Sequence, residues 1–320
     1  MTEFKSRFSD KLEGMLSLRV TRGYKRETHS RGLARFDRFC AGTFPQADTL
    51  SREIVHAWLG SESKDARNLS ASASAIRQLG KYLNSMGEEA YVLPDKFTPN
   101  KGKFVPYIFT DSELAALFAA IDSLPPDSME PFLTEIAPVL FRLIYTCGLR
   151  PGEGRELLTE NIDFDTGEIL IAHAKHNKER KVVMSDDMLA LCREYEKKRV
   201  IFGNGSRHFF PSSSGQAICS AKLLSTLAKA WTGAACSANN PIPHSIRVYD
   251  LRHRFASERL VRWLDEGQDL MRMLAYLRTY MGHGRLSETA YYIHILPENL
   301  VKSSAIDWGV FSAILPEVTR

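Results

Sequence analysis

The sequence predicts a mainly α-helical protein with one small antiparallel β-sheet, an α+β fold divided into two domains. Apolar residues recur at helical spacing through most of the 320-residue chain, and two short β-type runs occur only between residues 162 and 184. Residues 91–105 contain two prolines, one glycine and three lysines without helical periodicity, which is typical of a linker. We therefore expect a helical domain over residues 1–102, including most of that linker, and a mixed domain over residues 103–320.

The first domain shows clear helical signals. Residues 49–59 begin with threonine and serine, which are good N-cap residues, and continue into an apolar pattern. Residues 66–86 place one apolar stripe on a helix face: Leu69, Ala73, Ile76, Leu79, Tyr82, Leu83 and Met86. Gly87 follows as the expected C-cap.

Basic residues are dense near the N-terminus. This set comprises Arg19, Arg22, Lys25, Arg26, Arg31, Arg35 and Arg38. A solvated helix face and a phosphate-contacting face both explain such a pattern, and the sequence leaves the two open.

The second domain should begin with a helix. Further along, the spacing of its apolar residues changes from the helical period to the two-residue period of strands. Thr110 and Glu113 have the spacing of a capping box. The runs FDTGEILIA and KHNKERKVVMS, separated by a polar turn, predict a hairpin or a three-stranded sheet within residues 162–184. Helical patterns resume near residue 185, with polar interruptions at 202–217 and 235–246.

Composition narrows the class of protein. Five scattered cysteines without CxxC spacing indicate a reducing compartment and no zinc site. The chain has no apolar run of about 18 residues, and its charged N-terminus does not read as a secretory signal. A net charge of +4 is compatible with a nucleic-acid partner but does not establish one.

Four segments carry candidate functional residues. They are CGLRPGE at 147–153, AKHNKERKVV at 174–183, YDLRHRFAS at 249–257 and MGHGRLSETAYYIHI at 281–295. Gly148 and the Pro151–Gly152 pair should break the helix around Arg150, so that its guanidinium projects from a helix junction. Each segment alone has an ordinary structural explanation, whether as a helix cap, an exposed hairpin or a packed tyrosine.

Taken together and in this order, the segments resemble the catalytic domain of the tyrosine recombinases, the phage integrase family. Arg150 stands in a GLR-x-x-E context with Glu153, and Lys175 stands on a hairpin in a K-x-NK-x-R context. Arg252 occupies the arginine of an H-x-x-R-H segment. The resemblance covers residues 105–300, and the N-terminal helices are similar to the family's core-DNA-binding domain.

The last segment supplies the nucleophile of the family. Tyr292 lies nine residues after His283 of the GH pair, and His294 completes a Y-x-H pattern. Tyr291 competes for the role, but the spacing selects Tyr292.

The resemblance implies a C-shaped DNA clamp and a site-specific recombinase. Such an enzyme cleaves and rejoins DNA through a 3′-phosphotyrosyl intermediate and a Holliday junction, in integration, excision or resolution. The expected partners are double-stranded DNA with core sites and further copies of the chain, in a tetramer on synapsed DNA. The expected location is the cytoplasm, at the nucleoid. No metal or other cofactor is expected, because the tyrosyl phosphate conserves the energy of the broken bond.

The chemistry gives each residue an implied role. The transition state of phosphodiester cleavage gathers negative charge on the non-bridging oxygens, and Arg150 and Arg252 can each offer them forked donors. His283 would add another donor, and Lys175 is the family's general acid for the departing 5′-hydroxyl. The phenol of Tyr292 needs a cationic field or a base, because its reference pKa is about 10.

One position departs from the family. Tyr249 stands where the H-x-x-R motif has histidine, which leaves the general base unassigned. A phenol at that position can hydrogen-bond a phosphate oxygen or orient a neighbour. His253 and His244 lie nearby, but we expect neither to have the register to replace the histidine.

Two other functions remain open at this point. A type IB topoisomerase would use the same chemistry as a monomer on one duplex, and a catalytically decayed relative would only bind DNA. The tail, residues 296–320, bears on the first of these. Its apolar stripe would dock on a neighbouring recombinase subunit or pack on its own domain: Trp308, Val310, Phe311, Ile314 and Leu315.

Overall fold

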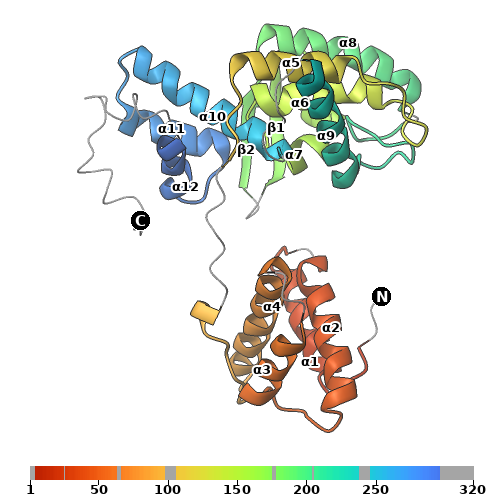
Figure 1. The fold of residues 1–320 in the computed structure, drawn as a ribbon, viewed down its shortest axis with the longest axis vertical. Helices are drawn as coiled ribbons and strands as arrows, with labels where there is room; N and C mark the ends of the chain where they lie inside the picture. The colour runs from red at the N-terminus through yellow and green to blue at the C-terminus, as the bar shows by residue number, and fades with distance from the viewer. Residues whose placement is uncertain are drawn as a thin grey trace. The chain divides into compact units, whose positions relative to one another are not determined.

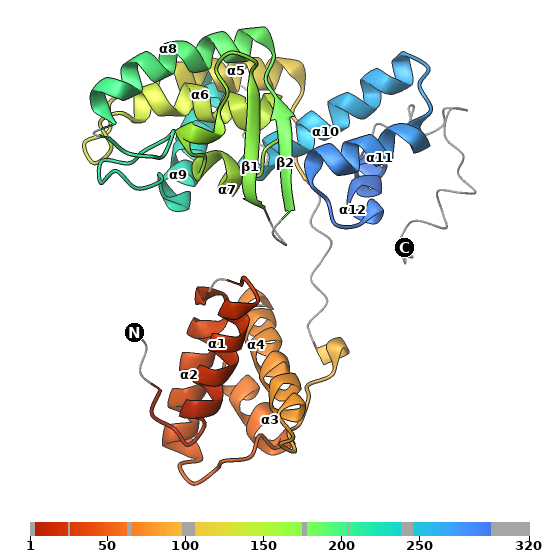
Figure 2. The same ribbon diagram turned by 180° about the vertical axis from the view of Figure 1, so that it is seen from behind.

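The computed structural model describes residues 4–24, 26–62, 66–97, 106–174, 178–203, 205–237 and 246–295. The chain divides into two compact units, residues 1–104 and 105–320. Within the described residues the fold is mainly helical with one small antiparallel sheet, so the predicted fold class is confirmed (Figures 1 and 2).

The first unit is a bundle of helices around one apolar core. Its elements are α1 (Ser9–Thr21), α2 (Glu27–Thr43), α3 (Arg52–Ser61), α4 (Ala66–Ser85) and the short 3-10 helix η1 (Asp95–Phe97). In this core Phe36 packs edge to face on Trp58 and lies tilted against Phe8. The side chain of Ser51 caps α3, as its sequence predicts.

The predicted stripe of α4 faces this core, with one exception. Ile76 and Leu79 are fully buried, whereas Met86 is 62% exposed. The expectation for Met86 was wrong because the helix ends at Ser85, before the stripe does. Gly87 then turns the chain with a φ of +85° and, as predicted, sits at the helix end.

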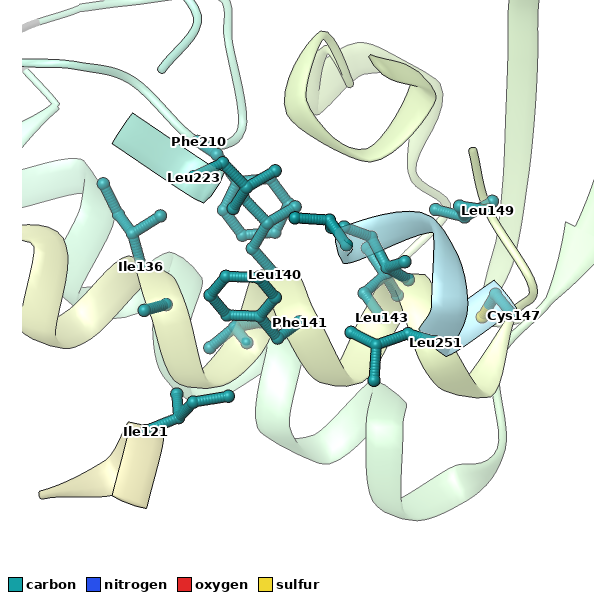
Figure 3. Packing of buried hydrophobic residues seen from close by; sticks show 14 of the residues in the cluster. Ile121, Ile136, Leu140, Phe141, Leu143, Cys147, Leu149, Phe210, Leu223 and Leu251 are labelled. Carbon is teal, nitrogen blue, oxygen red and sulfur yellow. The ribbon is translucent and has the colours of Figure 1, made fainter. Parts of the chain in front are cut away.

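The second unit begins with a group of helices that share one core. These elements are α5 (Asp111–Asp122), α6 (Leu133–Thr146), α7 (Pro151–Arg155), the 3-10 helix η2 (Thr159–Asn161), α8 (Asp186–Phe202) and α9 (Ser220–Ser237). The capping box of Thr110 and Glu113 starts α5 as predicted. Leu140, Phe141 and Phe210 lie at the centre of the packing, which Figure 3 shows.

The predicted hairpin is present beside this helical group. Strand β1 (Glu168–Ala174) pairs antiparallel with β2 (Lys178–Val183), and Ile171 faces Arg180 in the register. In both ribbon views the hairpin lies between this helical group and a second group of helices that follows it in the chain (Figures 1 and 2).

That second group ends the described chain. It consists of α10 (Val248–Asp265), α11 (Leu270–Met281), α12 (Leu286–Ala290) and the 3-10 helix η3 (Tyr291–Ile295). Gly282 ends α11 in the left-handed conformation, with a φ of +64°, and so directs the chain toward α12.

Three further properties hold for the described residues. None of their helices combines the length and apolarity that crossing a bilayer would need. Nowhere among them do three His, Cys, Asp or Glu side chains gather as metal ligands. The cysteines Cys40, Cys147, Cys192 and Cys219 are free thiols.

Candidate active site

Arg150 lies at the junction that the sequence predicts, at the N-cap of α7. Its backbone N–H and its Nη1 both donate to the carboxylate of Glu153, over 2.8 and 2.7 Å. The turn before it requires Gly148, whose φ is +59°. The guanidinium is therefore held at the junction by a carboxylate three residues further along the chain.

Glu153 is more central than its sequence context indicates. It also accepts two hydrogen bonds from Arg180 of β2, over 2.9 and 2.7 Å, and the side chains of the pair are only 9% and 7% exposed. Burial by itself raises the pKa of Glu153, but Arg180 and Arg150 together lower it to about 2. The carboxylate stays ionised and binds α7 to the hairpin.

Arg180 was not among the predicted site residues. Its sequence signal was its place on β2, two residues before Val182, which is fully buried. Because side chains two apart on a strand share a face, Arg180 had to point inward as well. An inward arginine on a strand needs a buried acidic partner, and Glu153 is that partner.

Three arginines from three elements bind the carboxyl end of α11. Arg180 donates to the carbonyl of Tyr280 over 2.8 Å, Arg252 to that of Met281 over 2.6 Å, and Arg150 to that of Gly282 over 2.7 Å. The last carbonyls of a helix lack partners within the helix and carry the negative end of its dipole. The helix end thus gathers the guanidinium groups at one place.

Arg252 is the most enclosed of the predicted residues, with a side chain that is 0% exposed. It donates to the carbonyl of Gly148 over 2.6 Å, which links α10 to the turn before Arg150. Burial lowers the pKa of the guanidinium from its ordinary value, although nearby phenols oppose this effect. Its Nε–H is buried without a partner among the described residues.

His283 lies beside Arg252 with both ring nitrogens engaged. Nη2 of Arg252 is 3.0 Å from Nε2, and Nδ1 is 2.8 Å from the hydroxyl of Thr289. A guanidinium can only donate, so Nε2 must be the acceptor and Nδ1 must carry the proton. Burial and the nearby arginines lower the pKa of His283 to about 3, so the ring is neutral. In this arrangement its one N–H already binds Thr289, so donation from His283 to a phosphate, which stays a prediction, would require that bond to be exchanged.

Tyr292 is 2% exposed and packs against two imidazole rings. Its ring centroid is 6.0 Å from that of His283, nearly parallel, and 5.4 Å from that of His253. Burial raises the pKa of the phenol to about 12, while the charge of Arg252 opposes the shift. Tyr291, its competitor, is only partly buried.

Tyr249 lies on the same side of the site. Its ring is 5.9 Å from the guanidinium carbon of Arg252 and 5.0 Å from the ring of His253. It also lines a cavity of about 660 Å³ together with Arg150, Gly152 and His208.

Two predicted residues fall outside this description. Lys175 belongs to residues 175–177, between the end of β1 and the start of β2, which lie outside the described residues. His294 is on η3, but its side chain is not among those described. The structure therefore brings together Arg150, Arg252, His283 and Tyr292, with Glu153 and Tyr249 beside them.

His253 is a further residue that sequence reasoning missed. Its ring contacts both Tyr249 and Tyr292, so it lies in the site although it does not occupy the position of the family's histidine. The signal was present in the sequence, since positions 249 and 253 are four apart on a helix and share a face.

A phenol grouped with buried arginines and neutral imidazoles suits phosphoryl transfer. Residues 108–299 match the model of the phage integrase family, which is more than half of the chain, and the chain therefore belongs to that family. Enzymes of this family are DNA strand transferases, and this chain is a tyrosine-type recombinase.

Relatives and solved structures agree with this placement. The chain is 27% identical to the integrase/recombinase y4rB of Sinorhizobium fredii, with 92% of this chain and 94% of the relative covered. It is 26% identical to the tyrosine recombinase XerD of Pseudomonas aeruginosa, with 84% and 86% covered. The fold is similar to that of the XerH recombinase, with a TM-score of 0.61 at 17% identity over 89% of this chain and 80% of that one. Lambda integrase gives 0.59 at 15% identity over 88% and 94%.

Proposed function

We propose that the chain cleaves and rejoins specific DNA sites with Tyr292 as its nucleophile and with Arg150 and Arg252 as the phosphate-binding pair. The observation that carries this proposal is the anchoring of both arginines on consecutive carbonyls, Gly282 and Met281, which are ten and eleven residues before the nucleophile. One segment thus fixes the separation between the cations and the phenol.

The electrostatics support an anionic substrate. An arginine carries five N–H donors, and three of those on Arg252 are paired among the described residues. A buried cation with a free donor is costly unless an anion satisfies it. A phosphate oxygen would meet that need, and the cavity beside Arg150 gives a nucleotide room to approach.

Two roles come from the family resemblance. Lys175 would protonate the departing 5′-oxygen, and Glu153 would keep Arg150 in place through the bonds described above. No step then requires a metal ion or a nucleotide cofactor, because the phosphotyrosyl bond stores the energy that religation uses.

A nicked suicide substrate tests the proposal. Wild-type protein should form a covalent DNA adduct, Tyr292→Phe should form none, and the matched control Tyr291→Phe should form it at the normal rate. An adduct with Tyr292→Phe, or none with wild type, would show that the catalytic assignment is wrong and would favour a protein that only binds DNA.

The first unit would form the other half of a DNA clamp. Arg31 and Arg38 are exposed one heptad apart on α2, whereas Arg26 and Arg35 are already paired with Glu13 and Glu62. Arg31 and Arg38 have no acidic partner among the described residues, which favours a phosphate-contacting face over a merely solvated one. The solved XerH structure contains its difH substrate, which makes the same partner class reasonable here.

The active assembly would be a tetramer, as in the solved lambda integrase bound to a Holliday junction. An aromatic cavity of about 570 Å³, lined by Phe255, Trp263, Tyr276 and Tyr280, could receive the apolar tail of a neighbouring copy. An enzyme with this substrate would work in the cytoplasm at the nucleoid. Crosslinking on synapsed sites should yield four subunits for a recombinase and one for a topoisomerase-like enzyme.

A further inference from the structure

We infer that His253, and not His283, accepts the proton of the Tyr292 phenol when the phenol attacks phosphorus. The inference rests on the function proposed above and goes beyond it, since neither the resemblance nor the spacing assigns a role to position 253. It follows from the hydrogen-bond partners of the groups around Tyr292.

The other candidate groups are occupied. The lone pair of His283 lies on Nε2, which already accepts from Arg252, and its single proton binds Thr289. The carboxylate of Glu153 accepts from two arginines and has a pKa of about 2, so it is a poor base. Tyr249 offers only another phenol. Among the described residues, these groups leave His253 as the remaining base in contact with the nucleophile.

His253 packs against the nucleophile and has a buried nitrogen without a partner among the described residues. Its ring lies against both phenols, 5.4 Å from the ring of Tyr292 and 5.0 Å from that of Tyr249. Its Nδ1 is buried and has no hydrogen-bond partner among the described residues. A buried, unpaired ring nitrogen costs free energy, and the cost is recovered if the nitrogen takes part in a proton transfer.

The charges around the ring keep it neutral and ready to accept. Burial first, and then Arg247 and Arg252, lower its pKa to about 4, and the neutral ring of His283 also lies near it. A neutral imidazole has one lone pair to offer. Arrival of an anionic phosphate would offset the two arginine charges and make that lone pair more basic.

The step is balanced in atoms and charge. The Oη–H bond of Tyr292 breaks as an N–H bond forms on His253, and the Oη–P bond forms as the P–O5′ bond breaks. The leaving 5′-oxygen takes a proton from a separate acid, for which Lys175 is proposed. In religation the imidazolium returns its proton to the departing phenolate.

Chemical rescue on the full-length protein tests the inference. With enzyme in excess over a nicked suicide substrate, His253→Ala should cleave about 100-fold more slowly than wild type at unchanged DNA affinity. Imidazole in the buffer should restore the rate in proportion to its free-base fraction. Pyrazole, which has the same size but is a far weaker base, should not. His56→Ala, a half-buried histidine of the first unit, is the matched control and should keep the normal rate.

A substrate with a modified leaving group distinguishes a general base from a general acid. A 5′-bridging phosphorothiolate leaves as a thiolate and needs no proton, so it should rescue Lys175→Ala and leave the defect of His253→Ala in place. Wild-type cleavage by His253→Ala, equal rescue by imidazole and pyrazole, or rescue by the phosphorothiolate would each overturn the role of His253. None of these outcomes would contradict the assignment of Tyr292 as the nucleophile, which the Tyr292→Phe and Tyr291→Phe variants test.

Discussion

The guanidinium of Arg252 donates to Nε2 of His283 over 3.0 Å, so the arginine fixes which nitrogen of the imidazole carries the proton. Thr289 completes the arrangement by accepting from Nδ1, and its side chain is fully buried. An imidazole whose two nitrogens are both hydrogen-bonded can hold Arg252 in place and stack on the ring of Tyr292. It therefore positions the neighbouring groups and does not exchange protons itself.

The first prediction concerns Thr289. Thr289→Val keeps the shape but removes the acceptor of a buried N–H, which costs about 1–3 kcal/mol and lets the imidazole turn. We expect covalent adduct formation to slow about 10-fold, with DNA affinity unchanged. Thr279→Val removes an exposed hydroxyl that bonds only within α11, and it should have no effect. Equal rates for the two variants would contradict the role given to Thr289.

A second prediction concerns the buried carboxylate. Glu153→Gln leaves Arg180 without its counter-charge in a buried setting, so we expect the free energy of unfolding to fall by about 3 kcal/mol. The matched control is Glu168→Gln, which breaks an exposed pair with Lys181 and should cost much less. Denaturant unfolding of both variants measures the difference, and a similar small loss in each would count against the buried network.

Substitutions at two glycines distinguish the cost of backbone strain from the cost of a packing clash. Gly148 and Gly267 both have a positive φ, but a Cβ on Gly148 would clash with the ring of Phe255, whereas one on Gly267 would meet nothing within 4 Å. Gly267→Ala should cost about 1 kcal/mol from the left-handed backbone. Gly148→Ala should cost about 1–3 kcal/mol more and should also slow cleavage, because its carbonyl binds Arg252. Identical thermal shifts would rule out the packing effect.

The buried histidines predict how stability depends on pH. The pKa values of His253 and His283 in the folded protein, about 4 and about 3, lie below the ordinary value of 6.5. The unfolded chain therefore binds more protons between these limits, and stability should fall as the pH drops below about 6.5. Calorimetry from about pH 7.5 to about pH 4.5 measures this slope above the range in which Glu153 titrates. His253→Gln and His283→Gln should each flatten it, and an unchanged slope in both would refute the assignment.

The clamp predicts a steep salt dependence. If both units contact phosphates, DNA affinity should drop on the order of 1,000-fold between about 50 and about 200 mM salt. The double substitution Arg31→Ala and Arg38→Ala should reduce the log–log slope by about 2, with little change in the sequence preferred. Fluorescence anisotropy titrations would measure both, and a flat dependence would argue against the clamp.

Local rules predicted much of the fold. The apolar stripe of α4, the caps of α3 and α5 and the change to a two-residue period at the hairpin all depend on neighbours in the sequence, and the structure contains each of them. Met86 shows where such rules end, since periodicity does not mark the residue at which a helix stops.

Motif spacing identified the site residues but did not predict which groups they hydrogen-bond. The motifs pointed to Arg150, Arg252, His283 and Tyr292 one at a time. The hydrogen bonds that bring the arginines to the end of α11 join residues 29 to 132 positions apart, and no local pattern encodes such contacts. Arg180 and His253 both stand inside the quoted motifs, but no role was assigned to them, because a strand register and a helix face give their side chains their direction.

The arginine-bound end of α11 has a consequence for how this enzyme can vary. What Tyr280, Met281 and Gly282 give the arginines are main-chain oxygens, which every amino acid possesses. Positions 280 and 281 can therefore be occupied by any residues that fit the packing, without loss of the hydrogen bonds to the guanidinium groups. A comparison of sequences would highlight the arginines and pass over the atoms that align them, so a designer who moved this site to another scaffold would have to copy the path of the backbone and not only the side chains.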